Sequence, residues 1–551
     1  MFRPLAVLAR HHPPARAALL LAVLVFGVSV LGVGLLRAAA YQPPELIVPS
    51  GSAALAGVGP TGPAGRCGTV PVQATRELRG MWLTTVFNID FPSRPGLPEA
   101  QVKAEYEKWL DLAVAQRHNA IFVHVRPSGD AFWPSAYAPW SEWLTGKRDG
   151  VSPGWDPIAF MVSEAHARNL EFHAWFNPYR GSQPAPAGPG ADFAKLAPAN
   201  PLLKHRDWAI AYPTGPAARL YFDPGNPAAR QFVEDAMLEA VQRYDVDGVH
   251  FDDFFYPYPQ QGQDFPDNAS YAKFGAGRSR ADWRRDNVNT LVREMSERIK
   301  ASKPWVKFGI SPFGIWRNRS HDPAGSNTNG LESYDAIYAD TRTWVREGWL
   351  DYIVPQLYWA IGFSKADYAK VLPWWAALVK GTAVQLYIGQ GDYRVGEPGA
   401  WSDPAQLDRQ LALNDTYGTQ GQVHFSAKSV RDDKLGAVTR YRDHHYAGPA
   451  LVPGMRRLPV ARPGAPRLVA ARRGPHGELD FDTVAGAGGA PASWALYRTA
   501  GAAAKLVATG RAGTQVADPA PPAADTAYCL STLDRSANES PISAPLTVDI
   551  P

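Results

Sequence analysis

The sequence predicts an α/β fold: a (βα)8 barrel of the TIM type with long βα loops, followed by a small all-β sandwich. Between residues 75 and 446, short apolar runs alternate eight times with amphipathic stretches, as expected of a parallel barrel surrounded by helices. Residues 467–551 instead contain short alternating runs separated by Gly and Pro turns, which is typical of a β-sandwich. A chain of 551 residues is also long enough for more than one domain.

Eight apolar runs are the predicted barrel strands, and helical periodicity or a long loop separates each from the next. The strands are 79–84, 120–126, 171–177, 248–254, 307–312, 352–358, 384–389 and 422–427. The clearest helices are 99–118, 228–244, 281–300, 334–347 and 404–417. The longest insertions, 178–226 and 255–280, follow strands. They are therefore expected at the C-terminal rim, where such barrels carry their active sites.

Residues 1–40 are predicted to be a signal peptide or an N-terminal anchor. Arg3, Arg10 and Arg16 precede the uncharged run 17–36, and three alanines follow at 38–40. A positive region, an apolar core and small residues are typical of a secretory signal, although ~20 apolar residues also suffice to span a membrane. In either case we expect an exported protein in the periplasm, the cell envelope or the extracellular space. Only if residues 17–36 are not cleaved do we expect them to anchor it to a membrane.

Two Pro-rich segments, a tether at 41–74 and a linker at 447–466, are predicted to flank the barrel at 75–446. In the C-terminal region, 527–531 and the following 534–540 resemble the F strand and F–G loop of a fibronectin type III domain. The chain has two cysteines, Cys67 and Cys529, and an oxidising compartment would permit a disulfide between them. Arg66 before Cys67 does not fit a lipoprotein cleavage box.

The composition excludes some partners and favours others. Hydrophobic residues make up 45% and charged residues 20% of the chain, as in a globular protein. The formal net charge is +4 without a dense basic block, so we expect no nucleic-acid partner. The 18 Trp and 22 Tyr residues would suit a carbohydrate partner, because sugars stack on aromatic faces, but large barrels also bury many aromatics.

Alternation along the strands predicts which polar side chains fill the barrel, because neighbouring residues point to opposite faces. Where the apolar residues of a strand face the helices, the polar residues between them must point inward. The predicted inward residues are His124, Arg126, His173, Trp175, Asn177, His250, Asp252, Gln356, Tyr358, His424 and Ser426. Burying so many polar groups is costly unless they bind one another or a polar ligand, so this interior predicts a functional site.

Carboxylates at the strand ends point to glycoside hydrolysis, which usually needs one carboxyl to donate a proton and another to attack or to activate water. Asp252 is the predicted nucleophile or base, since it points inward at the end of its strand; alternatively it binds Arg126 and only shapes the pocket. The predicted acid is left open among four loop residues, Asp253, Asp130, Glu332 and Asp392, and Asp392 is also a candidate for substrate binding.

Aromatic residues that follow the predicted strands are candidates for stacking on sugar rings, with ordinary loop packing as the alternative. They are Trp133, Tyr179, Phe254, Phe255, Tyr256, Trp316, Trp359 and Tyr393. An aromatic surround would also raise the pKa of the acid. No cofactor or metal is needed for this chemistry.

Six motifs in order resemble the bacterial glycosyl-hydrolase-like family ten. They are 79–82, 124–127, 173–180, 247–257, 310–317 and 351–359, and the resemblance covers roughly 75–446. It implies a (βα)8 fold, glycosidic hydrolysis without a metal, and residence in the cell envelope. Because this family includes enzymes that cleave peptidoglycan glycan strands without stem peptides, it also implies such a substrate. The resemblance matches a DGxxxDD-type motif to Asp247, Gly248, Asp252 and Asp253.

Two other functions remain possible from the sequence. His124, His173, His250 and His424 with Asp252 could ligate Zn²⁺ in an amidase or deacetylase, although the chain shows neither an HxH pair on the first strand nor an HExxH helix. A non-catalytic glycan-binding envelope protein is the other alternative, because no strand end offers an obvious acid.

Overall fold

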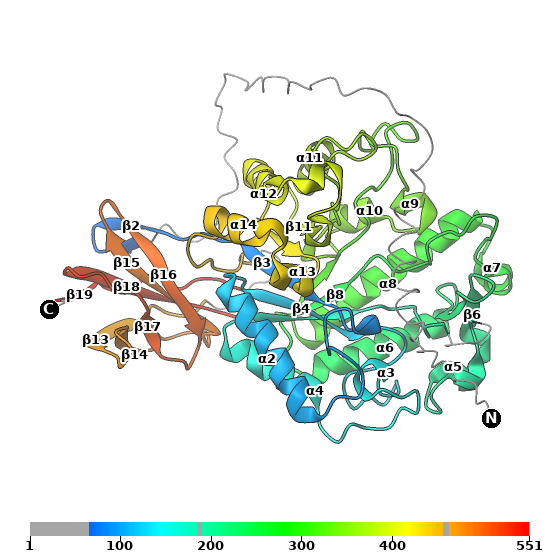
Figure 1. Ribbon diagram of the computed structural model, residues 1–551, viewed down its shortest axis with the longest axis horizontal. Helices are drawn as coiled ribbons and strands as arrows, with labels where there is room; N and C mark the ends of the chain where they lie inside the picture. Colours follow the sequence, from blue (N-terminus) through cyan, green and yellow to red (C-terminus); the bar gives the residue numbers. More distant parts are fainter. Residues whose placement is uncertain (1–64, 185–189, 456–461, 550–551) are drawn as a thin grey trace, which may run out of the picture. The chain divides into compact units, whose positions relative to one another are not determined.

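The computed structural model describes residues 65–184, 190–455 and 462–549, which fall within one compact unit of the chain (Figure 1). The predicted signal segment, most of the tether and part of the second linker lie outside these ranges. Within them, no helix is long and apolar enough to cross a membrane.

The predicted barrel is confirmed. Eight parallel strands close on themselves in the order β3, β4, β5, β8, β9, β10, β11, β12. Their bounds are β3 Leu78–Leu83, β4 Ala120–Arg126, β5 Glu171–Phe176, β8 Gly248–Phe251, β9 Lys307–Ile310, β10 Tyr352–Ile353, β11 Gln385–Gln390 and β12 Gly421–His424. Each overlaps one of the eight apolar runs in the sequence.

Helices connect consecutive barrel strands, as the βαβ rule requires. They are α2 Glu99–Ala115, α4 Pro157–Ala167, α6 Pro227–Arg243, α8 Arg280–Ser302, α10 Thr341–Arg346, α11 Tyr368–Val379 and α12 Gln406–Thr416, with α14 Ala437–His445 after the last strand. Side chains cap several of their first turns: Asn226, for example, accepts from the backbone N–H of Ala228 and precedes Pro227 at the first helical position. The predicted helix 334–347 is two helices, α9 Ser333–Ala336 and α10.

The loops at the C-terminal ends of the strands carry additional short elements. They are α3 Glu142–Thr145, α5 Pro201–Lys204, the hairpin β6 Ala209–Tyr212 with β7 Arg219–Phe222, α7 Asn268–Phe274 and α13 Ala427–Asp432. The two long insertions expected from the sequence thus contain α5, β6, β7 and α7.

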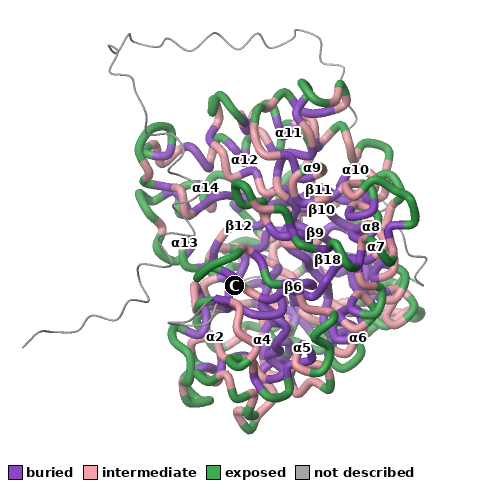
Figure 2. The backbone as a smooth tube through the Cα atoms, turned by 90° about the vertical axis from the view of Figure 1, so that its right-hand side faces the viewer, coloured by how far each residue is buried: buried purple, intermediate pink, exposed green. Residues whose placement is uncertain are grey.

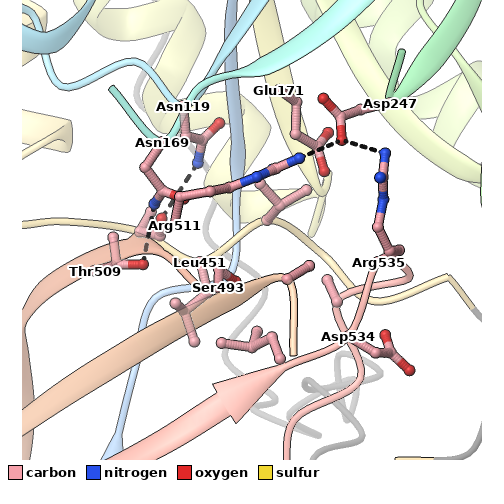
Figure 3. A pocket seen from close by; sticks show the side chains of 15 residues that line it. Asn119, Asn169, Glu171, Asp247, Leu451, Ser493, Thr509, Arg511, Asp534 and Arg535 are labelled. Carbon is pink, nitrogen blue, oxygen red and sulfur yellow. Dashed lines mark hydrogen bonds and ion pairs between the residues drawn. The ribbon is translucent and has the colours of Figure 1, made fainter. Parts of the chain in front are cut away.

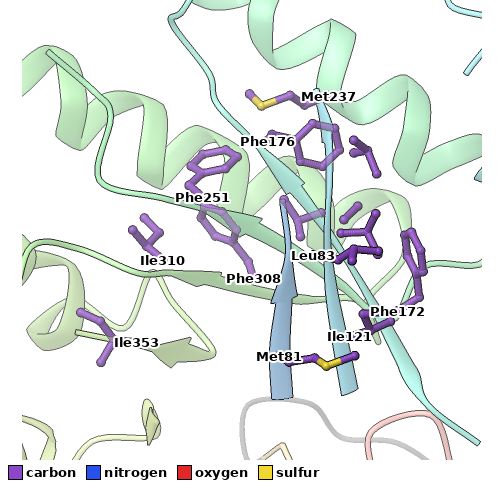
Figure 4. Close-up of a cluster of buried hydrophobic side chains, with 14 of the residues drawn as sticks. Met81, Leu83, Ile121, Phe172, Phe176, Met237, Phe251, Phe308, Ile310 and Ile353 are labelled. Carbon is purple, nitrogen blue, oxygen red and sulfur yellow. The ribbon is translucent and has the colours of Figure 1, made fainter. Parts of the chain in front are cut away.

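Two separate side-chain layers hold the barrel. Outside it, alternate strand residues such as Met81, Leu83 and Phe251 pack with the helices in one large apolar cluster (Figure 4). Inside it, Trp82, Trp175 and other residues form a second, largely aromatic cluster. The tube view shows the strands as a buried centre, with the exposed residues gathered on the surrounding loops and helices (Figure 2).

All-β sheets follow the barrel, as predicted. A six-stranded sheet has the order β1-β2-β16-β15-β18-β19, and a three-stranded sheet the order β13-β14-β17. The strands are β1 Arg66–Cys67, β2 Val70–Gln73, β13 Arg467–Arg473, β14 Leu479–Val484, β15 Ser493–Ala500, β16 Ala503–Arg511, β17 Val516–Asp518, β18 Thr526–Leu533 and β19 Leu546–Val548.

The prediction that the tether extends to residue 74 is wrong. Residues 66–73 form β1 and β2, and β2 pairs in parallel with β16. Cys67 of β1 forms a disulfide with Cys529 of β18, the pairing that the sequence only permitted. Chain segments on both sides of the barrel therefore build one sheet, which local sequence signals could not reveal.

The C-terminal sheets contact the end of the barrel opposite the strand termini that carry Asp252. Asp247, directly before β8, receives Arg511 of β16 and Arg535 from the loop after β18, with N–O distances of 3.3 and 3.4 Å. Figure 3 shows both guanidinium groups reaching this carboxylate beside a small cavity of about 50 Å³. The cavity is too small for a sugar, so it is not the candidate active site.

Candidate active site

Asp252 lies immediately after β8, inside the mouth of the barrel. Its side chain is 5% exposed. One carboxylate oxygen accepts from Trp175 Nε1 at 3.1 Å and Asn177 Nδ2 at 3.3 Å, and the other accepts from the backbone N–H of Phe254 at 3.1 Å. Strand alternation predicted this inward position, and the two donors come from the neighbouring β5 and the residue that follows it.

Asp253 is equally buried but bonds to the other side of the mouth. The Tyr258 hydroxyl donates to its carboxylate, and Gln356 also hydrogen-bonds to it. Gln356 Nε2 in turn donates to the Ser311 carbonyl at 2.8 Å, which ties the residues after β10 to those after β9. Two consecutive carboxylates thus face the same mouth, Asp252 beside β5 and Asp253 beside β9 and β10.

The pKa of both carboxyl groups lies above the ordinary value of an aspartate. Burial, together with the charge of Asp253, raises the pKa of Asp252 to about 7, against opposing contributions from Arg180 and the hydrogen bonds of Phe254 and Trp175. Burial also raises the pKa of Asp253, with Tyr258 opposing. Because like charges this close resist joint ionisation, the negative charge of Asp253 makes Asp252 harder to ionise.

Arg180 supplies positive charge to this pair. Its backbone N–H donates to Asn177 Oδ1 at 3.1 Å, and its guanidinium lies 4.4 Å from the centre of the Phe254 ring. Burial and nearby Arg219 lower its pKa, and the charges of Asp252 and Asp253 oppose this. The sequence prediction did not include Arg180, although it closes the motif that begins at His173.

Polar and aromatic side chains fill the barrel interior below Asp252 and Asp253. His250 accepts a hydrogen bond from Trp82 Nε1 at 3.2 Å and contacts the Ser311 hydroxyl at 3.0 Å. His124 stacks on Trp175 at 3.9 Å between ring centroids. Burial lowers the pKa of both histidines, so these rings are neutral and position Trp175 and Ser311.

His173 lies deeper, away from Asp252 and Asp253. Its ring nitrogens contact the Tyr352 hydroxyl at 2.9 Å and Glu171 at 3.0 Å. Lys307 donates to the same glutamate at 2.7 Å. His173 therefore belongs to a structural network at the base of the barrel rather than to the substrate-binding surface that the sequence predicted.

Aromatic rings line the mouth around the two aspartates. Phe254, Tyr258, Phe313 and Trp359 form a continuous edge-to-face series, with centroid separations of 5.6, 6.3 and 5.5 Å, and all four are partly exposed. On the β10–β12 side, Tyr358 packs against Phe425 at 5.8 Å and Tyr393 at 5.7 Å. Such rings offer both faces and edges to sugar rings. Tyr258 and Phe313 were missed because loop aromatics carry no periodic signal, and Phe425 because alternation placed His424 and Ser426 inside the barrel instead.

The other predicted carboxylates bond elsewhere. Asp130 accepts from the backbone N–H of Ser128 at 2.8 Å, and burial raises its pKa to about 6. Glu332 accepts from the backbone N–H of Asn318 and contacts His321 at 2.9 Å. Burial opposes its ionisation, but these bonds outweigh burial and hold its pKa below the ordinary value, which is wrong for an acid.

Asp392 and the histidine beside it face away from the interior. His424 lies 3.0 Å from Asp392 and stacks on Tyr441 of α14 at 4.5 Å. The prediction that His424 points into the barrel is therefore wrong. Ser426 likewise donates to Asp90 at 2.6 Å, and Val423 and Phe425 occupy the interior instead.

Several residues that were predicted to contact the substrate pack within the loops instead. Tyr179 is fully buried in the helix-facing cluster, near Arg230 and Glu234 of α6. Asn287 donates to the Tyr256 hydroxyl at 3.1 Å, and Trp316 stacks on Trp374 at 6.0 Å. These residues shape the loops without lining the mouth.

Arg126 does not form the alternative pair with Asp252, because its Nη1 donates to the carbonyls of Asn177 and Pro178 at 3.2 and 3.4 Å. The four histidines of the zinc alternative also do not converge, since His424 points outward and His173 lies at the base. In the described ranges, no group of three or more His, Cys, Asp or Glu side chains is arranged to hold a metal ion.

Comparisons with known proteins place this site in a family. The family model described as Glycosyl hydrolase-like 10 matches residues 77–407. Glycosyl hydrolase YngK of Bacillus subtilis is 48% identical over 414 residues, covering 74% of this chain and 79% of YngK. Glycosyl hydrolase DigH of Escherichia coli is 43% identical over 361 residues, covering 62% of this chain and 81% of DigH.

Among solved structures, the catalytic domain of a β-amylase from Paenibacillus polymyxa aligns with a TM-score of 0.42 and 9% identity, covering 68% of this chain and 99% of that one. The closed barrel is established by the strand pairing itself. The family model and the two relatives decide the assignment: the chain belongs to the glycosyl hydrolase-like 10 family.

Proposed function

We propose that this protein hydrolyses O-glycosidic bonds of a polysaccharide by carboxylate acid–base chemistry. The observation that carries the proposal is the Asp252–Asp253 pair, which is buried at the mouth of the barrel and in which burial raises the pKa of both carboxyl groups, that of Asp252 to about 7. In such a pair, one carboxyl can donate a proton to a leaving oxygen while the other remains anionic. The partly exposed rings around it suit the faces of sugars.

The proposed substrate is the glycan strand of peptidoglycan without stem peptides. Support comes from the motif resemblance across the barrel and from the expected export of the chain. The disulfide between Cys67 and Cys529 is consistent with an oxidising compartment. A periplasmic, envelope-associated or extracellular location, with residues 1–40 as signal or anchor, and a fibronectin type III-like identity for the C-terminal sheets, are parts of the same proposal.

The test is a digest of peptide-free peptidoglycan glycan strands by the purified full-length protein, with products identified by mass spectrometry. Asp252→Asn is the inactive variant, and Asp130→Asn is its matched control, because Asp130 is a buried carboxyl with a raised pKa but its bonds lie within its own loop.

We expect soluble saccharides with unmodified reducing ends from the wild type and Asp130→Asn. The yield from Asp252→Asn should be lower by about 10²–10⁴-fold. Binding of the glycan without any release of saccharides by the wild type would refute hydrolysis and support a binding role. Equal release by wild type and Asp252→Asn would remove this aspartate from the chemistry.

A further inference from the structure

One loop at the C-terminal rim of the barrel holds an aromatic ring out of the protein. Phe87 follows β3 in the single turn η2 Val86–Asn88, and it is 41% exposed. Phe87 and Asn88 have φ angles of 56° and 50°, in the left-handed region that residues other than glycine rarely adopt. An exposed ring alone would need no explanation, but two successive strained residues that hold it out do.

Hydrogen bonds to the neighbouring strand ends keep this strained loop in place. Asp90 accepts from the Ser426 hydroxyl at 2.6 Å and from the backbone N–H of Lys428 at 3.0 Å, both after β12. The Thr85 hydroxyl donates to the His124 carbonyl of β4 at 2.7 Å. The loop is therefore fastened to both neighbours of β3 in the barrel, and none of these bonds involves the exposed aromatic ring.

A second ring extends the aromatic surface at this place. Phe87 packs on the partly exposed Trp143 of α3, with 5.0 Å between the ring centroids, and Asn88 Nδ2 donates to the Trp143 carbonyl at 2.8 Å. The turn η2 lies in the loop after β3, and α3 lies in the loop after β4. Two adjacent loops of the C-terminal rim thus build one surface, the Phe87–Trp143 pair, which we call the rim platform.

The rim platform continues the series of rings around the mouth. Partly exposed rings line the mouth from β8 to β12, as described above, and β3 and β4 follow β12 in the closed barrel. In the other direction, β5 and β4 lie between β8 and β3. Because neighbouring strands are about 4.8 Å apart, β3 lies roughly 15 Å around the wall from β8, which carries Asp252 at its end. A chain of several sugars can span this separation, and a single sugar cannot.

We propose that the rim platform is a remote glycan-binding subsite, at which a sugar several residues away from the scissile bond stacks on Phe87. This inference rests on the proposed glycoside hydrolysis and adds a determinant of chain length to it. Carbohydrate is the occupant that the geometry favours, because the platform lies at the same rim as Asp252 and Asp253 and continues their ring-lined mouth. A ring that is already held out rigidly loses little conformational freedom when a ligand binds, so the strained loop serves to present it.

A short series of contacts fixes the rim platform relative to the carboxylates. The Thr85 hydroxyl bonds to the His124 carbonyl, and the His124 ring stacks on Trp175 at 3.9 Å. The indole N–H of Trp175 in turn donates to Asp252 at 3.1 Å. An oligosaccharide that stacks on Phe87 is therefore held at a constant offset from Asp252. The subsite should consequently favour long glycan strands over short fragments.

Calorimetry on the full-length protein with Asp252→Asn, which should leave the glycan intact, measures the affinity for long peptide-free peptidoglycan strands relative to their disaccharide unit. Adding Phe87→Ala should lower this affinity ratio about tenfold, as expected from the loss of one stacking contact, whereas Phe87→Tyr should keep it. Tyr417→Ala is the matched control, because Tyr417 is 43% exposed but follows α12, at the opposite end of the barrel. Equal ratios for Phe87→Ala and Tyr417→Ala would overturn the inference.

The stability of a glycine variant shows whether Phe87 has a structural role instead. Phe87→Gly removes the ring and the backbone strain together, so its urea midpoint should equal or exceed that of the wild type. A marked fall, as for a core residue, would mean that the ring holds the loop together and would overturn the inference.

Digestion of the same strands by the protein with Asp252 intact separates this inference from the proposed hydrolysis. If strands bind with a length preference that depends on Phe87 but are not cleaved, hydrolysis fails and the subsite stands. If strands are cleaved and the preference does not depend on Phe87, hydrolysis stands and the subsite fails. If the strands neither bind nor are cleaved, both proposals fail.

Discussion

Replacing Asp247 should lower the free energy of unfolding more than replacing an exposed charged residue nearby. Its side chain is 8% exposed, and its carboxylate contacts His166 Nε2 at 2.7 Å, the backbone N–H of Phe172 at 2.9 Å and the guanidinium groups of Arg511 and Arg535. Burial opposes its ionisation, but the bond to His166 and the charges of both arginines hold its pKa far below the ordinary value.

Asp247→Asn keeps the shape of this side chain and removes its charge, which leaves two arginines without their shared partner. Breaking a buried ion pair on one side costs about 3–5 kcal/mol. Asp245→Asn is the matched control, because Asp245 contacts Arg535 and His166 as well but its side chain is 52% exposed. An exposed pair contributes roughly 0–1 kcal/mol.

Equilibrium unfolding in urea at pH 7 measures both variants. The sign of the pH dependence is a second readout: since the folded pKa of Asp247 lies below its unfolded value of about 3.9, its stabilisation is complete above that value and is lost as the pH falls toward the folded pKa. The gap between wild type and Asp247→Asn should therefore shrink below about pH 4. Equal losses for Asp247→Asn and Asp245→Asn at pH 7 would refute the reasoning.

Three further predictions concern the disulfide, the acid pair and the aromatic mouth. Replacing both Cys67 and Cys529 by Ser should lower the unfolding free energy by about 2–5 kcal/mol; identical urea midpoints before and after reduction of the wild type would contradict this. The value of kcat/KM should fall as the pH rises through about 7, because ionisation of Asp252, whose pKa burial raises to about 7, removes a proton donor from the pair; a value that keeps rising to pH 9 would contradict it. Trp359→Ala should raise KM severalfold with little change in kcat, whereas Tyr417→Ala, 43% exposed on the surface, should change neither; equal effects would exclude stacking on Trp359.

The barrel could be predicted because its signal is local and repeated. Apolar runs of strand length recur between helical stretches, and the run 120–126 coincides with β4. Strand ends were less predictable: the run 352–358 contains a two-residue β10, since Pro355 has no N–H for the ladder. The parallel contact of β2 with β16 could not be predicted, because it joins segments more than 400 residues apart and no local pattern specifies it.

Alternation along a strand predicted correctly which side chains point inward only where the residues facing the helices were apolar. On β4, β5 and β8 this holds, and Asp252 was placed correctly. On β12 the rule failed because the interior there is itself apolar: Val423 and Phe425 pack with Trp82 inside. The polar His424 faces outward because Asp392 and Tyr446 bond to it there. Whether a polar strand residue finds a polar partner on its outer side depends on tertiary packing, which the sequence of the strand does not reveal.

The electrostatics of β8 differ at its two ends. Asp247 is more acidic in the folded state than in the unfolded chain, so its ionisation stabilises the fold. Asp252 is less acidic when folded, so between about pH 4 and 7 its ionisation lowers stability as the pH rises. Pairing with β5 and β9 on both sides holds β8 in place despite this unfavourable ionisation. Burial opposes ionisation at both ends of β8: the partners of Asp247 outweigh it, whereas those of Asp252 do not.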